Sequence, residues 1–119
     1  MILTLHRTPD GQVRTDLTPE KLNAALEDPG SLLWVDLGDE PAGICEPILH
    51  EIFGFHSLSV EDALQESHSP KVDDWGEYLY IVLHAVSIGP SDGNETGLAQ
   101  HELETQELDI FLGSHYLVT

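Results

Sequence analysis

Two neighbouring acids, Glu61 and Asp62, are the residues in this sequence best suited to chemistry. They fall in residues 57–65, which predict a short helix capped by Ser57 or Ser59. Neighbouring residues on a helix point about 100° apart, so both carboxylates can approach one partner surface without sharing one ion tightly. Carboxylate oxygens suit hard divalent cations, and magnesium is often held through its own waters. The pair predicts a weak metal site that another segment or subunit would have to complete.

The same two acids also have a structural interpretation. Acids in the first turns of a helix interact favourably with the helix dipole, and charge and spacing alone favour this explanation. A second acidic group, Asp36, Asp39 and Glu40, follows a predicted strand and precedes a predicted helix. These three acids could coordinate a cation, but a role in capping the next helix is favoured because acids are common there.

The remaining reactive residue types do not form a catalytic pattern. The sequence contains no HExxH or CxxC motif, no nucleophile elbow and no glycine-rich phosphate loop. No two of its histidines are three or four residues apart; His50 is expected at the surface and His84 in the core or facing a partner. The single cysteine, Cys45, cannot form an internal disulfide and is expected to be a small buried residue in a reducing compartment. The sequence therefore favours a protein that is not an enzyme.

Composition limits the partners. The chain has 119 residues, enough for one domain, and 22 acids against 4 basic residues give a formal net charge of −18. This charge argues against nucleic acid and anionic membrane surfaces as partners, and it favours cations. On charge alone, a solvated acidic surface that keeps the protein soluble is the simpler explanation. We expect no signal peptide, and no window approaches the roughly 18 apolar residues of a membrane span.

The order of apolar runs and turn signals predicts an α/β fold, with a mixed parallel and antiparallel sheet and helices packed on both faces. Residues 78–86 are expected to be a strand buried on both faces, antiparallel to residues 103–112 across a flexible loop at residues 89–97. In the helix expected at residues 41–53, Ile44, Ile48, Leu49 and Ile52 should face inward, and Gly54 should end it. The other expected elements are strands at residues 1–6, 12–15, 31–37 and 115–119, a helix that starts at Pro19 after a Thr18 cap, and turns at residues 66–70 and 113–114.

Pieces of sequence spread along the chain also carry a resemblance. They are WVDL (34–37), FHSL (55–58), VEDAL (60–64), PKV (70–72), YLYIVLH (78–84), ELDIFL (107–112) and YLVT (116–119). In this order and spacing they resemble the cytosolic N-terminal domain of the CorA family of magnesium channels and transporters. The family's Gly-Met-Asn signature is absent and the chain ends inside a predicted strand, so residues 1–119 are expected to be one cytosolic regulatory domain truncated from a longer membrane protein.

The resemblance implies a function for Glu61 and Asp62. In CorA proteins, acids at these positions help to form divalent-cation sites between neighbouring cytosolic domains, and bound Mg²⁺ holds the homopentamer closed. The expected partners are thus neighbouring subunits and divalent cations. The domain would lie at the cytoplasmic face of the inner membrane and would reach the membrane only through the missing C-terminal part. His56 matches a family histidine for which we expect a structural hydrogen bond.

One departure and two alternatives remain. The family often has Gln-Arg-Pro-Lys where this chain has His68-Ser69-Pro70-Lys71, which makes the local field more negative. The alternative within the family is the corresponding domain of a ZntB-like zinc transporter. The alternative from another class is an acidic protein-interaction module without metal, which a titration with divalent cations would distinguish.

Overall fold

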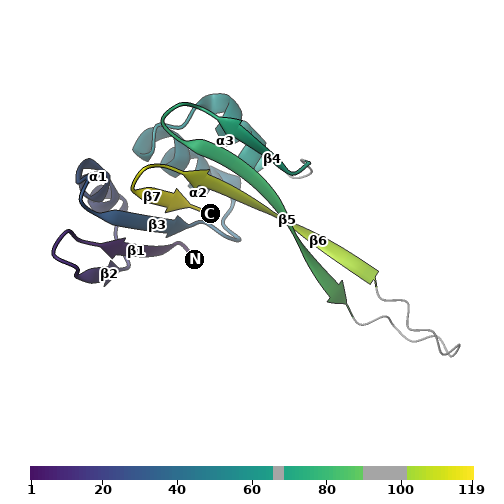
Figure 1. The fold of residues 1–119 in the computed structure, drawn as a ribbon, viewed down its shortest axis with the longest axis horizontal. Helices are drawn as coiled ribbons and strands as arrows, with labels where there is room; N and C mark the ends of the chain where they lie inside the picture. The colour runs from purple at the N-terminus through teal and green to yellow at the C-terminus, as the bar shows by residue number, and fades with distance from the viewer. Residues whose placement is uncertain (66–68, 90–101) are drawn as a thin grey trace, which may run out of the picture.

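The structure is a computed structural model that describes residues 1–65, 69–89 and 102–119. In these ranges the chain forms one seven-stranded sheet with the order β2-β1-β3-β7-β6-β5-β4 (Figure 1). The strands are β1 (Leu3–Arg7), β2 (Val13–Thr15), β3 (Leu32–Asp36), β4 (Lys71–Asp74), β5 (Leu79–Gly89), β6 (Glu102–Leu112) and β7 (Tyr116–Val118). The helical segments are α1 (Pro19–Glu27), α2 (Ala42–Pro47), the π-helical turn η1 (Ile48–Ile52) and α3 (Ser57–Leu64).

The sheet is mixed, which confirms the predicted fold class. Strands β3 and β7 run parallel, and the other neighbouring pairs are antiparallel. The longest pairing joins β5 to β6, from Leu79 opposite Leu112 to Gly89 opposite Glu102. These two strands extend past the body as a ribbon (Figure 1). The predicted loop between them lies, apart from Gly89, outside the described residues.

The hydrophobic core lies between one face of the sheet and the helices. Alternate strand residues point into it and are almost fully buried, and the helices and the segment before α3 supply the facing side chains. The strand residues are Leu33, Val35, Tyr80, Val82, Phe111 and Val118, and their partners include Leu22, Cys45, Ile48, Leu49, Phe55 and Val60. Cys45 is buried, as predicted. Burial of this apolar area supplies the main driving force for folding.

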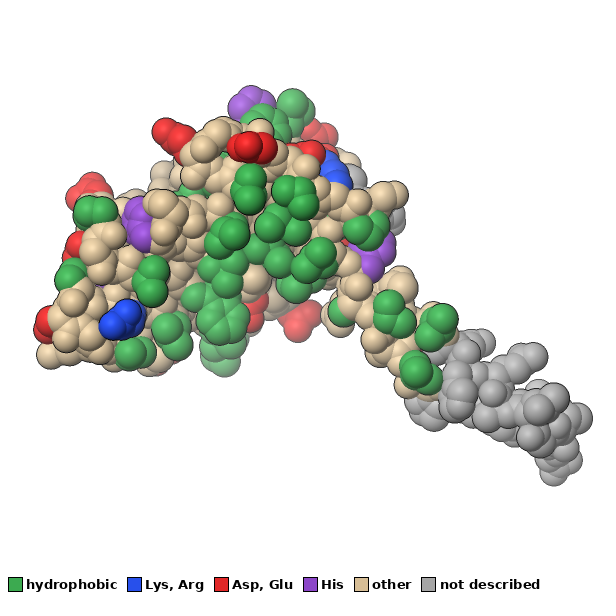
Figure 2. Space-filling view, in the orientation of Figure 1, with side chains coloured by type: hydrophobic (Ala, Val, Ile, Leu, Met, Phe, Trp, Pro, Cys, Tyr) green, Lys and Arg blue, Asp and Glu red, His purple; other side chains and the backbone are tan. Residues whose placement is uncertain are grey.

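The other face of the sheet is open, which corrects the expectation of helices on both faces. Seven apolar side chains on this face are between 41% and 52% exposed; they are Leu3, Leu5, Leu32, Trp34, Leu83, Leu108 and Leu112. Figure 2 shows hydrophobic side chains gathered over the centre of the molecule in this view. A continuous apolar run predicts that both faces of a strand are apolar, and this is true here. The run does not determine whether helices pack on both faces, and the described helices pack on one.

The apolar run in β5 led to the expectation that residues 78–86 are buried on both faces, but only the first half of the strand is covered by helices. Tyr80 and Val82 are completely buried, whereas Val86 is 62% exposed and Ile88 is 66% exposed. The second half of the strand lies in the ribbon beyond the helices (Figure 1). Residues 86–88 therefore form a strand, in keeping with their high β-propensity, although no described helix packs on them.

The helix predicted at residues 41–53 is divided in two. Pro47 lacks an N–H group, and beyond it the backbone adopts the wider turn of η1, in which the Phe53 N–H donates to the Ile48 carbonyl (3.1 Å). Ile48 and Leu49 are buried as predicted, but Ile44 is 46% exposed, so its inward placement was wrong. Gly54 ends the segment with a φ of 69°, a conformation that glycine adopts without strain.

Strand β4 was not predicted at all. Its four residues pair with β5 from Lys71 opposite Val82 to Asp74 opposite Leu79. The segment is short and highly charged, so sequence propensity does not favour a strand there; the exposed edge of β5 supplies the hydrogen bonds that form it. Among the described residues, no helix is long and apolar enough to cross a membrane.

The turn between β6 and β7 requires a glycine at position 113. A Cβ atom there would lie 2.2 Å from Tyr116 Cζ, and the Tyr116 ring is held against Phe53 and Phe55. We expect Gly113→Ala to lower the free energy of unfolding by about 1–3 kcal/mol, because the ring must leave its packed position. Urea denaturation measures the change. Gly43→Ala is the control, since its Cβ meets nothing within 4 Å in α2; equal losses in the two variants would contradict this role for Gly113.

Candidate functional site

Helix α3 carries the predicted pair and begins with a histidine cap. The His56 Nδ1 atom accepts a hydrogen bond from the Leu58 N–H (3.1 Å), so the prediction that Ser57 or Ser59 would cap the helix was wrong. The ring nitrogen at the cap position accepts the backbone hydrogen bond that a serine hydroxyl usually accepts. The imidazole also stacks on the Trp75 ring, with the centroids 4.6 Å apart. The structural hydrogen bond expected of His56 is therefore present.

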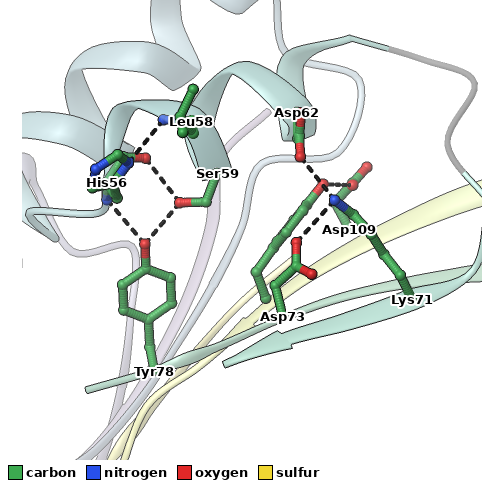
Figure 3. A network of polar contacts seen from close by, with 9 residues as sticks. His56, Leu58, Ser59, Asp62, Lys71, Asp73, Tyr78 and Asp109 are labelled. Carbon is green, nitrogen blue, oxygen red and sulfur yellow. Dashed lines mark hydrogen bonds and ion pairs between the residues drawn. The ribbon is translucent and has the colours of Figure 1, made fainter. Parts of the chain in front are cut away.

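Ser59 has a different role, because its side chain is completely buried. Its hydroxyl donates to the His56 carbonyl (2.8 Å) and lies 2.7 Å from the Tyr78 hydroxyl. The Tyr78 oxygen in turn accepts a hydrogen bond from the His56 N–H (2.9 Å). Figure 3 shows this group of contacts, which joins the first turn of α3 to the residue just before β5.

Glu61 and Asp62 are the fifth and sixth residues of the eight-residue helix, and its first turn contains no acid. This position argues against the helix-dipole explanation, since the favourable dipole interaction falls off within the first turn. Glu61 is exposed and accepts a hydrogen bond from Gln65 Nε2 (3.2 Å). Asp62 is partly buried and faces the sheet. The two carboxylates thus point in different directions, as the helical spacing predicts.

Asp62 contacts a lysine that the sequence analysis did not connect with it. The Lys71 Nζ atom lies 2.8 Å from Asp62 Oδ2 and 2.9 Å from Asp73 Oδ2, and it lies 5.4 Å from the centre of the Tyr80 ring. The hydrogen bond that Lys71 donates to Asp62, followed by the one that it donates to Asp73, raises the pKa of Lys71 above its ordinary value. The ammonium group therefore remains charged and joins α3 to β4 (Figure 3).

A buried tyrosine lies next to this ion pair. The Tyr80 side chain is completely buried, and its hydroxyl donates to Asp109 Oδ1 on β6. Burial, followed by the hydrogen bond to Asp109, raises the pKa of Tyr80 well above its usual range. The phenol therefore keeps its proton and acts as a donor. Further along the ribbon, His84 Nε2 lies 3.7 Å from Glu107 Oε2.

The acids after β3 neither cap a helix nor form a cation site. The residue that precedes α2 is Pro41, which forms no side-chain cap, so the favoured capping role was wrong. Asp36 Oδ1 instead accepts from the Gly38 N–H (3.1 Å) and from Thr119 Oγ1 (3.3 Å), while Glu40 pairs with the amino group of Met1. Within residues 1–65, 69–89 and 102–119, no group of three or more His, Cys, Asp or Glu side chains could hold a metal ion. The Glu61–Asp62 pair remains a candidate, and its two carboxylates do not form a complete metal site among the described residues.

Of the neighbouring residues Asp62, Lys71, Asp73, Tyr80 and Asp109, sequence reasoning identified only Asp62 as a site residue. Asp73 and Lys71 were missed because β4 was not recognised, and Asp109 lies 29 residues from the tyrosine that it binds. One signal in the sequence was available. Lys71 is the only Lys or Arg after Lys21, so it is surrounded in the sequence by acids and is expected to pair with one of them.

Two solved structures share this arrangement of elements. The full-length CmaX protein aligns with 98% of this chain and 33% of its own, with a TM-score of 0.56 and 18% identity. The soluble domain of CorA from Methanocaldococcus jannaschii aligns with 100% of this chain and 39% of its own, with a TM-score of 0.55 and 17% identity. These likenesses show the fold, which is that of a CorA-type soluble domain.

The sequence comparisons assign the family. The model of the family described as "CorA-like Mg2+ transporter protein" matches residues 29–119. "Putative metal ion transporter YfjQ" of Bacillus subtilis (strain 168) is 34% identical over 86 residues, which are 72% of this chain and 23% of YfjQ. This chain belongs to the CorA-like family of magnesium transporter proteins, a family of transporters rather than enzymes. It spans about a quarter of the length of the relative that it matches.

The contacts of Tyr78 give a test of how α3 is held. We expect Tyr78→Phe to lower the free energy of unfolding by about 1–3 kcal/mol, because the His56 N–H and the buried Ser59 hydroxyl both lose a partner. Ser57→Ala should change it by less than about 0.5 kcal/mol, since Ser57 is exposed and His56 is the cap. Chemical denaturation of both variants measures the difference. A larger loss from Ser57→Ala would restore the serine cap that the sequence suggested.

Proposed function

We propose that this chain is the cytosolic sensor and gating domain of a CorA-like magnesium transporter, and that Glu61 and Asp62 provide its divalent-cation site. The observation that supports this most directly is the placement of the pair. Glu61 presents an exposed carboxylate on α3, and Asp62 beside it already holds a cationic group. The pair therefore combines an exposed carboxylate with one that lies against a positive charge, and both features support a cation site.

The ligand chemistry favours magnesium over zinc. Glu61 and Asp62 offer carboxylate oxygens, which suit Mg²⁺, whereas zinc sites in proteins are usually built with imidazole and thiolate ligands. Two carboxylates leave most of the coordination shell of magnesium to water. In this proposal, a neighbouring subunit of a homopentamer supplies the further acids, so the ion lies between two cytosolic domains at the cytoplasmic face of the membrane.

The mechanism would be thermodynamic linkage. An ion held between two subunits binds the closed arrangement more tightly than an arrangement in which the subunits have separated, and it therefore shifts the population toward the closed state. A differential affinity of 5–150-fold corresponds to a coupling of about 1–3 kcal/mol. Loss of cytosolic magnesium would release this coupling and favour the conducting state.

A double substitution in the full-length transporter tests the proposal. We expect Glu61→Ala/Asp62→Ala to keep transport active at magnesium concentrations that close the unmodified protein. The fold should change little, because Glu61 is exposed and an ion pair as exposed as Asp62–Lys71 contributes about 0–1 kcal/mol. Magnesium uptake into vesicles, measured against internal magnesium, gives the result.

Glu46→Ala/Glu51→Ala is the matched control. Both residues are exposed acids on the neighbouring helical segments, so the variant has the same net charge as the first. Closure by magnesium should be retained in this control. Unchanged closure in the Glu61→Ala/Asp62→Ala variant would contradict the proposed site, and an equal loss in the control would show that only net charge matters.

A further inference from the structure

Lys71 is an exception in a strongly acidic chain. The protein has 22 acids and 4 basic residues, and the other three, Arg7, Arg14 and Lys21, all lie near the N-terminus. The only basic residue in the rest of the sequence is therefore placed against Asp62, one of the two candidate ligands. Many other acids were available as partners for this lysine, so the placement requires an explanation.

The geometry places the ammonium group where a metal ion would have to approach Asp62. Its Nζ atom lies between Asp62 on α3 and Asp73 on β4, at 2.8 Å and 2.9 Å from one oxygen of each. Lys71 and Asp73 are two residues apart on one strand, so their side chains share the face that carries the helices. Figure 3 shows Asp62 and Asp73 converging on the lysine from two elements.

Solvent can reach all three side chains. They are 32%, 35% and 38% exposed for Lys71, Asp62 and Asp73, so the pair is not sealed inside the core. An ammonium group on a flexible stem can leave such a site when a stronger cation arrives.

We propose that Lys71 is an intramolecular competitor for the divalent cation: it occupies the inner side of Asp62 and thereby lowers the affinity of the Glu61–Asp62 pair. This inference rests on the proposed function, since it concerns the same site. Two cations cannot approach one carboxylate at such distances without repelling each other. A magnesium ion must therefore displace the lysine from the inner side of Asp62 or bind through Glu61 without Asp62, and both routes raise the concentration needed for occupancy.

The consequence concerns the range in which a sensor responds. A regulatory site must be partly empty at the concentrations that it measures, so the concentration at which the pair fills must be matched to that range. A tethered cation does this without removing either ligand. The acids thus remain available, and the lysine sets how much magnesium is needed to use them.

Calorimetric titration of the chain with magnesium chloride, at constant ionic strength, tests the competition. We expect Lys71→Met to bind Mg²⁺ about threefold to tenfold more tightly than the unmodified chain, which is the range expected when one or two exposed ion pairs no longer compete. Lys21→Met is the matched control, because it removes the same charge from an exposed position on α1. Lys71→Arg keeps the charge and should bind magnesium as the unmodified chain does.

Two further variants separate the possible results. Asp62→Asn should remove the gain when combined with Lys71→Met, because the gain depends on that carboxylate. Lys71→Gln also removes the charge, and circular dichroism will show which charge-removing variant is folded. Equal affinities of the Lys71→Met and Lys21→Met variants would overturn the competition, and a gain that survives Asp62→Asn would overturn it as well.

The outcome is independent of the transport test. If Asp62→Asn weakens magnesium binding but Lys71→Met does not strengthen it, the ion site stands and Lys71 is only a structural link between α3 and β4. If Lys71→Met strengthens binding through Asp62 while Glu61→Ala/Asp62→Ala leaves magnesium closure unchanged, the competition stands and the proposed gating role fails.

Discussion

The position of Phe55 is the packing constraint on which the site depends. Its ring is 1% exposed and stacks on Phe111 with centroids 4.2 Å apart, and it also contacts the rings of Tyr78 and Tyr116. The positive φ of Gly54 lets the chain turn after η1 so that Phe55 enters the core. Because α3 begins two residues later, this ring fixes where the helix starts and which way its second turn faces. Aromatic stacking adds about 0.5–1.5 kcal/mol per pair to the apolar burial.

Polar contacts then orient the helix that the aromatic packing has placed. The Tyr78 hydroxyl binds the first turn through His56 and Ser59, and Lys71 binds the second turn through Asp62. The first group is buried and uncharged, and the second is charged and partly exposed to solvent. One short helix is therefore held at its first turn by buried neutral contacts and at its second turn by an ion pair that solvent reaches.

The sequence predicted the mixed fold class and six of the seven strands along the chain, because apolar periodicity and turn residues are local signals. The turn at Gly113, the end of the helical segment at Gly54 and the antiparallel pairing of β5 with β6 all follow from such signals. Strand β4 was not predicted, because its stability comes from pairing with the edge of β5 and not from its own residues. The His56 cap was not predicted either, since the two neighbouring serines are better caps on average. Lys71 and Asp73 were missed for the first of these reasons, because both lie on β4.

The site and the open apolar face lie on opposite sides of the sheet. In β4, Lys71 and Asp73 face the helices, whereas Val72 points to the open side and is 63% exposed. The alternation of side chains along a strand thus separates charge from apolar surface within four residues. Burial of the open face would remove apolar area from water without desolvating Asp62, Lys71 or Asp73. In the proposed mechanism, the affinity for an ion at Glu61 and Asp62 therefore depends on the helical side, on α3 and β4, and not on what contacts the open face.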